Sequence, residues 1–138
     1  MKAFAVCAAL LALAGWQLVG QVAKGKTRPL ETKIWMKTVN GPHCSTLAKM
    51  LKAGPADDKE WGDVKTHAQM LSESGHVLMA DGRCPDKVWA DASKQLQEGG
   101  AAVAAAASSK DLEGARSALN NSVLASCKGC HGAHRVKK

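Results

Sequence analysis

The sequence is poor in aromatic residues: its 138 positions hold no Tyr, one Phe and four Trp. Hydrophobic residues still make up 46% of the chain, but many of them are alanine. A core built from such small side chains has little bulk, so an embedded cofactor is one way to supply the missing apolar volume. Close packing of alanine-rich helices on one another is the other way.

Two further patterns are missing. No segment alternates Val, Ile or Thr with polar residues as a β-strand does, so a fold built on sheets is excluded. No run of basic residues is interleaved with aromatics, which argues against nucleic acid as a partner although the formal net charge is +7. The positive charge instead favours an acidic protein or a membrane surface.

The beginning of the chain has the layout of a secretory signal peptide. Lys2 precedes an apolar run over residues 3–14, and small residues follow it. The run is too short to span a membrane. We expect residues 1–23 to be cleaved off, which leaves residues 24–138 as one domain of an exported, periplasmic protein without a membrane span. An uncleaved anchor, extended by the apolar residues just beyond the run, is the alternative.

Four helices are predicted in the exported domain, because apolar residues recur there every three or four positions. Their ranges are about 29–53, 58–80, 85–108 and 111–135. Short links join them, so the fold class is expected to be all-α, an up-down-up-down four-helix bundle. Gly41-Pro42 lies within the first range, where the proline should kink or break the helix.

The last predicted helix carries the most distinctive chemistry. One apolar stripe along it consists of Leu112, Ala115, Leu119, Val123, Cys127 and His131. The motif Cys127-Lys128-Gly129-Cys130-His131 is therefore expected on a helix, and the stripe predicts that it faces the core.

Cys-x-x-Cys-His is the attachment motif of c-type haem. The two thiols add to the porphyrin vinyl groups as thioethers, and the histidine supplies an axial nitrogen to the iron. Zinc binding and thiol–disulfide exchange are the alternatives. A structural zinc site usually needs two such cysteine pairs, and a thioredoxin-like motif needs a strand before its helix. The chain shows neither feature, so we predict one covalent haem c near its C-terminus.

The end of the chain resembles the final helix of class II cytochromes c, the cytochrome c prime superfamily. The resemblance is carried by DLEGARSALNNSVLASCKGCHGAHRVKK, where two residues, a histidine and an arginine follow the motif. It covers roughly residues 30–135 and implies a four-helix bundle with haem held at its C-terminal end. It also implies that Cys127 and Cys130 attach the haem and that His131 is the proximal iron ligand. Arg135 lies one helical turn after His131, so it is expected on the haem side.

The resemblance leaves the other face of the iron open. Some members of the family keep it empty and bind small gases, whereas others supply a methionine from the first helix and transfer electrons. The stretch IWMKTVNGPHCSTLAKML is similar to the methionine branch and implies Met36 as the distal ligand. That branch often has an arginine where this chain has Thr32. His43, two turns from Met36 on the same predicted stripe, is the weaker candidate.

The sequence contains five cysteines, and Cys7 lies in the predicted signal peptide. Outside the haem motif, the exported domain then keeps Cys44 and Cys84. Thiols outside the cytoplasm tend to be oxidised, so we expect these two to form a disulfide. The pairing requires the first helix to be broken near Gly41-Pro42.

These features predict an exported mono-haem cytochrome that transfers single electrons and is not an enzyme, because no acid, base or nucleophile cluster accompanies the motif. Two other functions stay open. One is a five-coordinate haem protein that binds or senses NO or CO, and the other is a weak haem peroxidase with His43 as its acid–base group. We expect an acidic redox protein as partner and no nucleic acid. The resemblance also suggests a homodimer through the first two helices.

Overall fold

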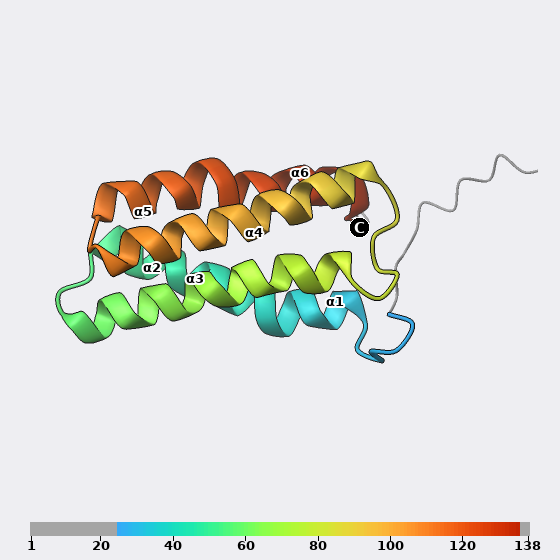
Figure 1. Ribbon diagram of the computed structural model, residues 1–138, viewed down its shortest axis with the longest axis horizontal. Helices are drawn as coiled ribbons and strands as arrows, with labels where there is room; N and C mark the ends of the chain where they lie inside the picture. The colour runs from blue at the N-terminus through green and yellow to red at the C-terminus, as the bar shows by residue number, and fades with distance from the viewer. Residues whose placement is uncertain (1–24, 136–138) are drawn as a thin grey trace, which may run out of the picture.

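The computed structural model describes residues 25–135, which form helices and short connections with no β-strand among them. The predicted signal peptide lies outside these residues. The described part consists of four helical rods lying side by side, and consecutive rods run in opposite directions (Figure 1). The predictions of an all-helical fold and of four helices are confirmed for this part, and the arrangement is that of a helical bundle.

Two of the rods contain a π-helical segment. The first rod consists of α1 (Thr32–Trp35), the π-helix η1 (Met36–Asn40) and α2 (Gly41–Ala53). The second and third rods are α3 (Asp58–Met79) and α4 (Lys87–Ser108). The fourth rod consists of α5 (Leu112–Ala118), the π-helix η2 (Leu119–Leu124) and α6 (Ala125–His134).

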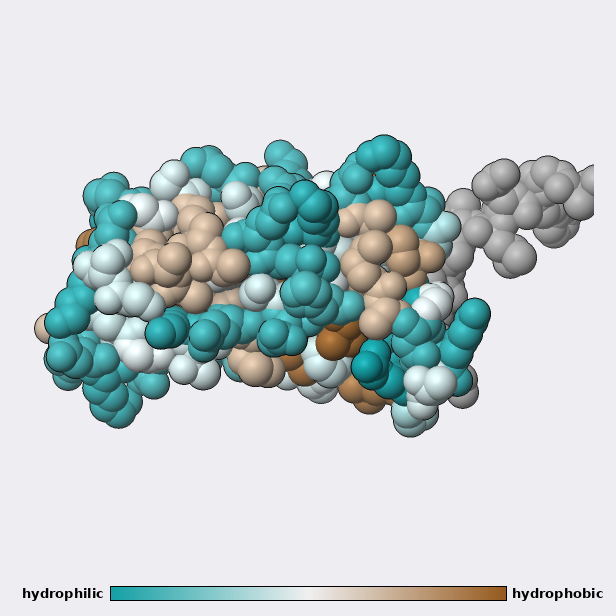
Figure 2. Space-filling view, in the orientation of Figure 1, coloured by the Kyte–Doolittle hydropathy of each residue, from teal (hydrophilic) through white to brown (hydrophobic). Residues whose placement is uncertain are grey.

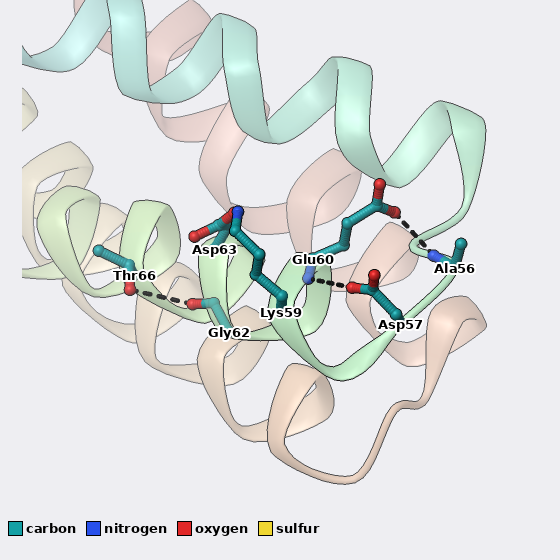
Figure 3. Close-up of polar contacts among 7 residues, drawn as sticks. All are labelled: Ala56, Asp57, Lys59, Glu60, Gly62, Asp63 and Thr66. Carbon is teal, nitrogen blue, oxygen red and sulfur yellow. Dashed lines mark hydrogen bonds and ion pairs between the residues drawn. The ribbon is translucent and has the colours of Figure 1, made fainter.

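Aspartate caps begin the last three rods. Asp57 Oδ1 accepts a hydrogen bond from the Glu60 backbone N–H at 2.8 Å, and Asp86 and Asp111 accept equivalent bonds at the starts of α4 and α5. At α3 the Glu60 side chain reaches back and accepts from the Ala56 N–H at 2.7 Å (Figure 3). This reciprocal pairing satisfies two backbone donors and fixes where α3 begins.

Apolar residues that recur every three or four positions along the second and third rods form much of the core. Val64, Ala68 and Leu71 of α3 are no more than 1% exposed, and Leu96 and Val103 of α4 are similarly buried. Alanine also covers the outside of the bundle. Positions 101, 102 and 105 of α4 are exposed, and Figure 2 shows a moderately hydrophobic patch over α4 and α5 on an otherwise largely hydrophilic face. The high hydrophobic fraction is therefore shared between core and surface.

Glycines bring α3 and α4 close together. A Cβ on Gly100 would lie 2.6 Å from the Ser72 backbone nitrogen, and one on Gly75 would lie 2.7 Å from the Ser93 carbonyl oxygen. Real Cβ contacts are longer, so each helix presents a glycine where the other helix's backbone approaches. None of the helices among the described residues is both long and apolar enough to cross a lipid bilayer.

Gly41-Pro42 does not break the first rod, so of the two predicted outcomes, a kink or a break, the break is wrong. Asn40 and Gly41 keep right-handed helical dihedrals, with φ near −60°. In an α-helix the proline ring would clash with the carbonyl four residues earlier. Here the π-helical η1 lies directly before α2, and its wider turn changes the spacing to the preceding carbonyls. The chain therefore continues as a helix past Pro42.

Candidate functional site

A cavity of about 380 Å³ lies between the first, third and fourth rods. Its lining includes five hydrocarbon side chains, Ala48, Leu78, Ala92, Leu96 and Leu124, and four small polar ones, Asn40, Ser45, Ser93 and Ser126. Its volume and apolar lining are those of a site for a small organic molecule or cofactor.

The haem-attachment motif lies on one wall of this cavity. Cys127, Cys130 and His131 all line it from α6. Cys130 is 9% exposed, Cys127 is half-buried and His131 is exposed. The structure thus brings the three predicted residues together at one apolar cavity.

The predicted apolar stripe is wrong for the last turns of the fourth rod. Ser126 and Cys130, not Cys127 and His131, are the buried residues after Val123. The predicted stripe advances by four residues at every step after Ala115, which drifts around a helix of 3.6 residues per turn. A step of three after Val123 keeps to one face and reaches Ser126, and a step of four then reaches Cys130. Cys127 and His131 consequently lie at the rim of the core, where they face the cavity.

The two motif thiols differ in acidity. The Cys44 thiol donates a hydrogen bond to Cys127, which lowers the pKa of Cys127 to about 7 despite its burial. Burial raises the pKa of Cys130 to about 11, helped by the nearby charges of Cys127 and Asp86. The pKa of Cys44 is raised, mainly because its proton is held in the bond to Cys127. Cys127 is therefore the more readily ionised, more nucleophilic thiol.

Met36 lines the same cavity from η1. Asn40 Nδ2 donates to Met36 Sδ at 3.3 Å, and Ser74 Oγ donates to Asn40 Oδ1. Trp35 Nε1 in turn donates to Ser74 Oγ at 2.6 Å. Because Ser74 is fully buried and Asn40 is 8% exposed, this chain of hydrogen bonds is shielded from water. These hydrogen bonds hold the Met36 side chain in place.

Sequence reasoning missed this network. Asn40 and Ser74 are polar residues in buried positions of otherwise apolar helices, and that is the only signal the sequence offers. Both partners of Ser74 lie 34 or more residues away along the chain, so only the packing of the first rod on α3 reveals them.

His43 does not belong to the cavity lining. Its Nδ1 lies 2.8 Å from Nδ1 of His67 on α3, within hydrogen-bond distance. Burial, and secondarily the charge of His67, lower the pKa of His43. The weaker of the two candidates for the distal position therefore faces α3, whereas the neighbouring Cys44 faces the cavity.

The residues that follow the motif connect α6 to the start of α4. His134, with a side chain 9% exposed, packs edge-on against Trp89 with ring centroids 5.3 Å apart, and its Nε2 lies 3.4 Å from Asp86 Oδ1. Neither ring nitrogen of His134 has a hydrogen-bond partner. Arg135 is exposed, and its charge adds to the effect of burial in lowering the pKa of His131.

The predicted Cys44–Cys84 disulfide is not formed: both thiols are free, and Cys84 Sγ donates to the Asp86 carbonyl at 3.4 Å. Arg83, next to Cys84, donates to Thr32 Oγ1 at the very start of the first rod. Cys44 lies twelve residues further along that rod, on the order of 15 Å away. A disulfide needs Cα atoms about 4–7 Å apart, so the unbroken first rod keeps the two cysteines separate.

The residues at the cavity fit a haem. Two thiols and an imidazole lie on one wall, a thioether lies in the lining with them, and hydrocarbon side chains line much of the rest, together with a few small polar residues. Among residues 25–135, no group of three or more His, Cys, Asp or Glu is arranged to hold a metal ion by itself. A haem needs only one or two axial ligands from the protein, because the porphyrin supplies the others.

Comparisons of the chain with protein-family models, with curated proteins and with solved structures found no match.

Proposed function

We propose that this chain is an exported, periplasmic mono-haem cytochrome c, similar to the class II cytochromes c, that transfers single electrons. The observation that carries the proposal is the apolar cavity. It gathers Cys127, Cys130 and His131 from α6 and Met36 from η1, which are 91 or more residues apart in sequence. No other function considered for the motif requires this combination of thiols, imidazole and thioether around hydrocarbon walls.

Each residue of the set has a defined role in this proposal. Cys127 and Cys130 would hold the haem through thioethers, and His131 would supply the proximal nitrogen. Bound haem supplies the one-electron change between iron(II) and iron(III). Leu78, Leu96 and the other hydrocarbon walls exclude water from the site, which is how a protein tunes the potential of such a group.

Met36 is the proposed distal ligand, because its thioether lines the same cavity as His131. Asn40 is itself held by Ser74 and Trp35, so the methionine side chain is kept on the cavity wall. Methionine raises the reduction potential relative to histidine, as suits an electron carrier.

A second function is favoured by the same contact. The Asn40 amide hydrogen bond occupies a lone pair of Met36 Sδ, and a sulfur engaged in this way competes less well for iron. If Met36 stays bound to Asn40, the distal position is open, and the protein binds NO or CO. The peroxidase function has no such support, because His43, its acid–base candidate, contacts His67.

An absorption spectrum of the holoprotein, made in a host that attaches c-type haem, tests the proposal. We expect a far-red sulfur-to-iron band in the oxidised protein, lost in Met36→Ala and kept in the control Met70→Ala, which changes an exposed methionine of α3. A high-spin spectrum that changes on adding CO would favour gas binding over electron transfer. Purified protein without covalent haem, from a host that loads a control cytochrome, would contradict both functions.

A further inference from the structure

Two histidines face each other between the first and second rods, outside the proposed haem site. His43 lies near the start of α2, and His67 lies in the middle of α3. Their Nδ1 atoms are 2.8 Å apart, and the ring centroids are 5.0 Å apart with the planes tilted by 56°. Both residues are partly exposed, so solvent reaches the pair.

The distance between the two nitrogens indicates which metal geometry the pair would suit. Histidine nitrogens bind metals at about 2.0–2.1 Å, so nitrogens 2.8 Å apart would subtend an angle of about 84–89° at a shared ion. A tetrahedral ion such as zinc would instead require roughly 3.3–3.4 Å between the nitrogens. An angle near 90° is that of neighbouring ligands in a square-planar or tetragonal site, the geometry of Cu(II) and Ni(II).

We propose that His43 and His67 together form a binding site for divalent copper. Copper binds nitrogen ligands more strongly than the other divalent first-row metals, and imidazole suits it well. Two histidines fill two neighbouring equatorial positions, and water from the open side fills the others. The site depends on neither the cavity nor the α6 motif, since neither histidine lines the cavity.

The surroundings of the pair favour the neutral imidazoles that bind metals. Partial burial and the second ring lower the pKa of His43, so His43 is uncharged at neutral pH. Copper would replace the hydrogen bond between the rings, and the proton on the donor Nδ1 would move to Nε2 of the same ring. Asp63, one turn before His67, is paired with Lys59 at 2.9 Å (Figure 3). Among the described residues no third His, Cys, Asp or Glu joins the two histidines, so the protein supplies two ligands to the proposed site.

Titration of the purified full-length protein with Cu²⁺ tests the site. Thiols are first alkylated with iodoacetamide, so that they neither bind nor reduce the metal. Calorimetry should find one Cu²⁺ site, and electron paramagnetic resonance should show two equatorial nitrogens. His43→Gln and His67→Gln should each weaken binding by roughly tenfold or more, because loss of even an outer-shell partner costs 10–100-fold. His76→Gln, on the exposed side of α3, is the matched control and should bind Cu²⁺ as the parent does.

The melting temperature gives a second readout that does not depend on comparing affinities. Cu²⁺ should raise the melting temperature of the parent and of His76→Gln, because it links α2 to α3 only in the folded state. It should not raise the melting temperature of His43→Gln or His67→Gln. Circular dichroism establishes that each variant is folded. Equal copper binding in all four proteins, or no binding by the parent, would overturn the proposal. Zinc binding as tight as copper binding would overturn the tetragonal geometry. The haem spectrum is recorded separately, so neither result depends on the other.

Discussion

Cys44 contacts a different thiol from Cys84, the partner that cysteine counting suggests. It donates a hydrogen bond to Cys127, which lowers the pKa of Cys127 to about 7. A substantial fraction of Cys127 is therefore thiolate at neutral pH, poised both for addition to a haem vinyl group and for disulfide exchange. Before haem is attached, these two reactions compete at the same sulfur.

Haem-free protein treated with oxidised glutathione should therefore form a Cys44–Cys127 disulfide, with two molecules of reduced glutathione released. Peptide mapping by mass spectrometry detects the bridge. In Cys44→Ser, Cys127 should be glutathionylated or paired with Cys130 instead, whereas Cys84→Ser should leave the bridge unchanged. A bridge between Cys44 and Cys84 would mean that the first rod is broken after all.

Asn40 links Met36 to the buried hydroxyl of Ser74. In Asn40→Leu the Ser74 hydroxyl loses its acceptor in a site without water, so we expect a loss of about 1–3 kcal/mol in the free energy of unfolding. Urea denaturation measures it. Thr38→Ala, which removes an exposed hydroxyl bonded to the Ile34 carbonyl, is the control and should cost less than about 0.5 kcal/mol. Equal losses in the two variants would show that the network adds nothing to stability.

At the scale of helices, the contact between α3 and α4 depends on glycine. A Cβ on Gly100 would press against the Ser72 and Ala68 backbones, which cannot move as a flexible side chain can. A Cβ on Gly62, an exposed glycine of α3, would meet nothing within 4 Å. Alanine substitutions at the two positions therefore distinguish the effect of helix packing on stability from the effect of helix propensity.

Gly100→Ala should destabilise the protein by about 1–3 kcal/mol, because the extra carbon forces the two helices apart. Gly62→Ala should stabilise it by roughly 0.5–1 kcal/mol through helix propensity, and the Thr66 hydroxyl bond to the Gly62 carbonyl is retained (Figure 3). Thermal melts followed by circular dichroism compare the two. A stabilised Gly100→Ala would show that α3 and α4 do not pack as closely as described.

The contact between α2 and α3 should depend on pH. Burial lowers the pKa of His43 from its ordinary 6.5, so below pH 6.5 the unfolded chain binds more protons at this residue than the folded chain. Its contribution to stability is therefore lost as pH falls from 6.5 towards the folded-state pKa. Urea midpoints at pH 7.5 and pH 5 should differ less in His43→Gln than in the parent. An unchanged difference would assign the acid sensitivity to other groups such as His131, whose pKa is also lowered.

At the scale of the whole molecule, the net charge of +7 sets an expectation about the redox partner. Opposite charge on a partner steers the encounter, and salt screens it over a Debye length of about 10 Å at 0.1 M. The bimolecular rate of electron transfer with an acidic redox protein should fall as ionic strength rises, and stopped-flow absorbance at the haem band measures it. A basic redox protein is the control, since its rate should rise with salt. Electron-transfer rates that do not change with ionic strength for either partner would contradict electrostatic docking.

The sequence by itself determined the helical class, the four ranges and the inward stripes of α3 and α4. Apolar residues spaced every three or four positions can bury themselves together only on helices, and Val64, Leu71 and Leu96 do so. The sequence also carries the haem-attachment motif whole, because its three residues are adjacent in the chain.

Only the tertiary structure decided which side chains face each other. The π-helical η1 lets the first rod continue past Pro42. The buried face of the fourth rod reaches Ser126 and Cys130 because the helix has about 3.6 residues per turn, whereas the predicted stripe advanced by four at each step. The partners of Cys44 and His43 were likewise decided by packing. Each lies on another rod, and its distance depends on how the rods are aligned along the bundle rather than on spacing in the sequence.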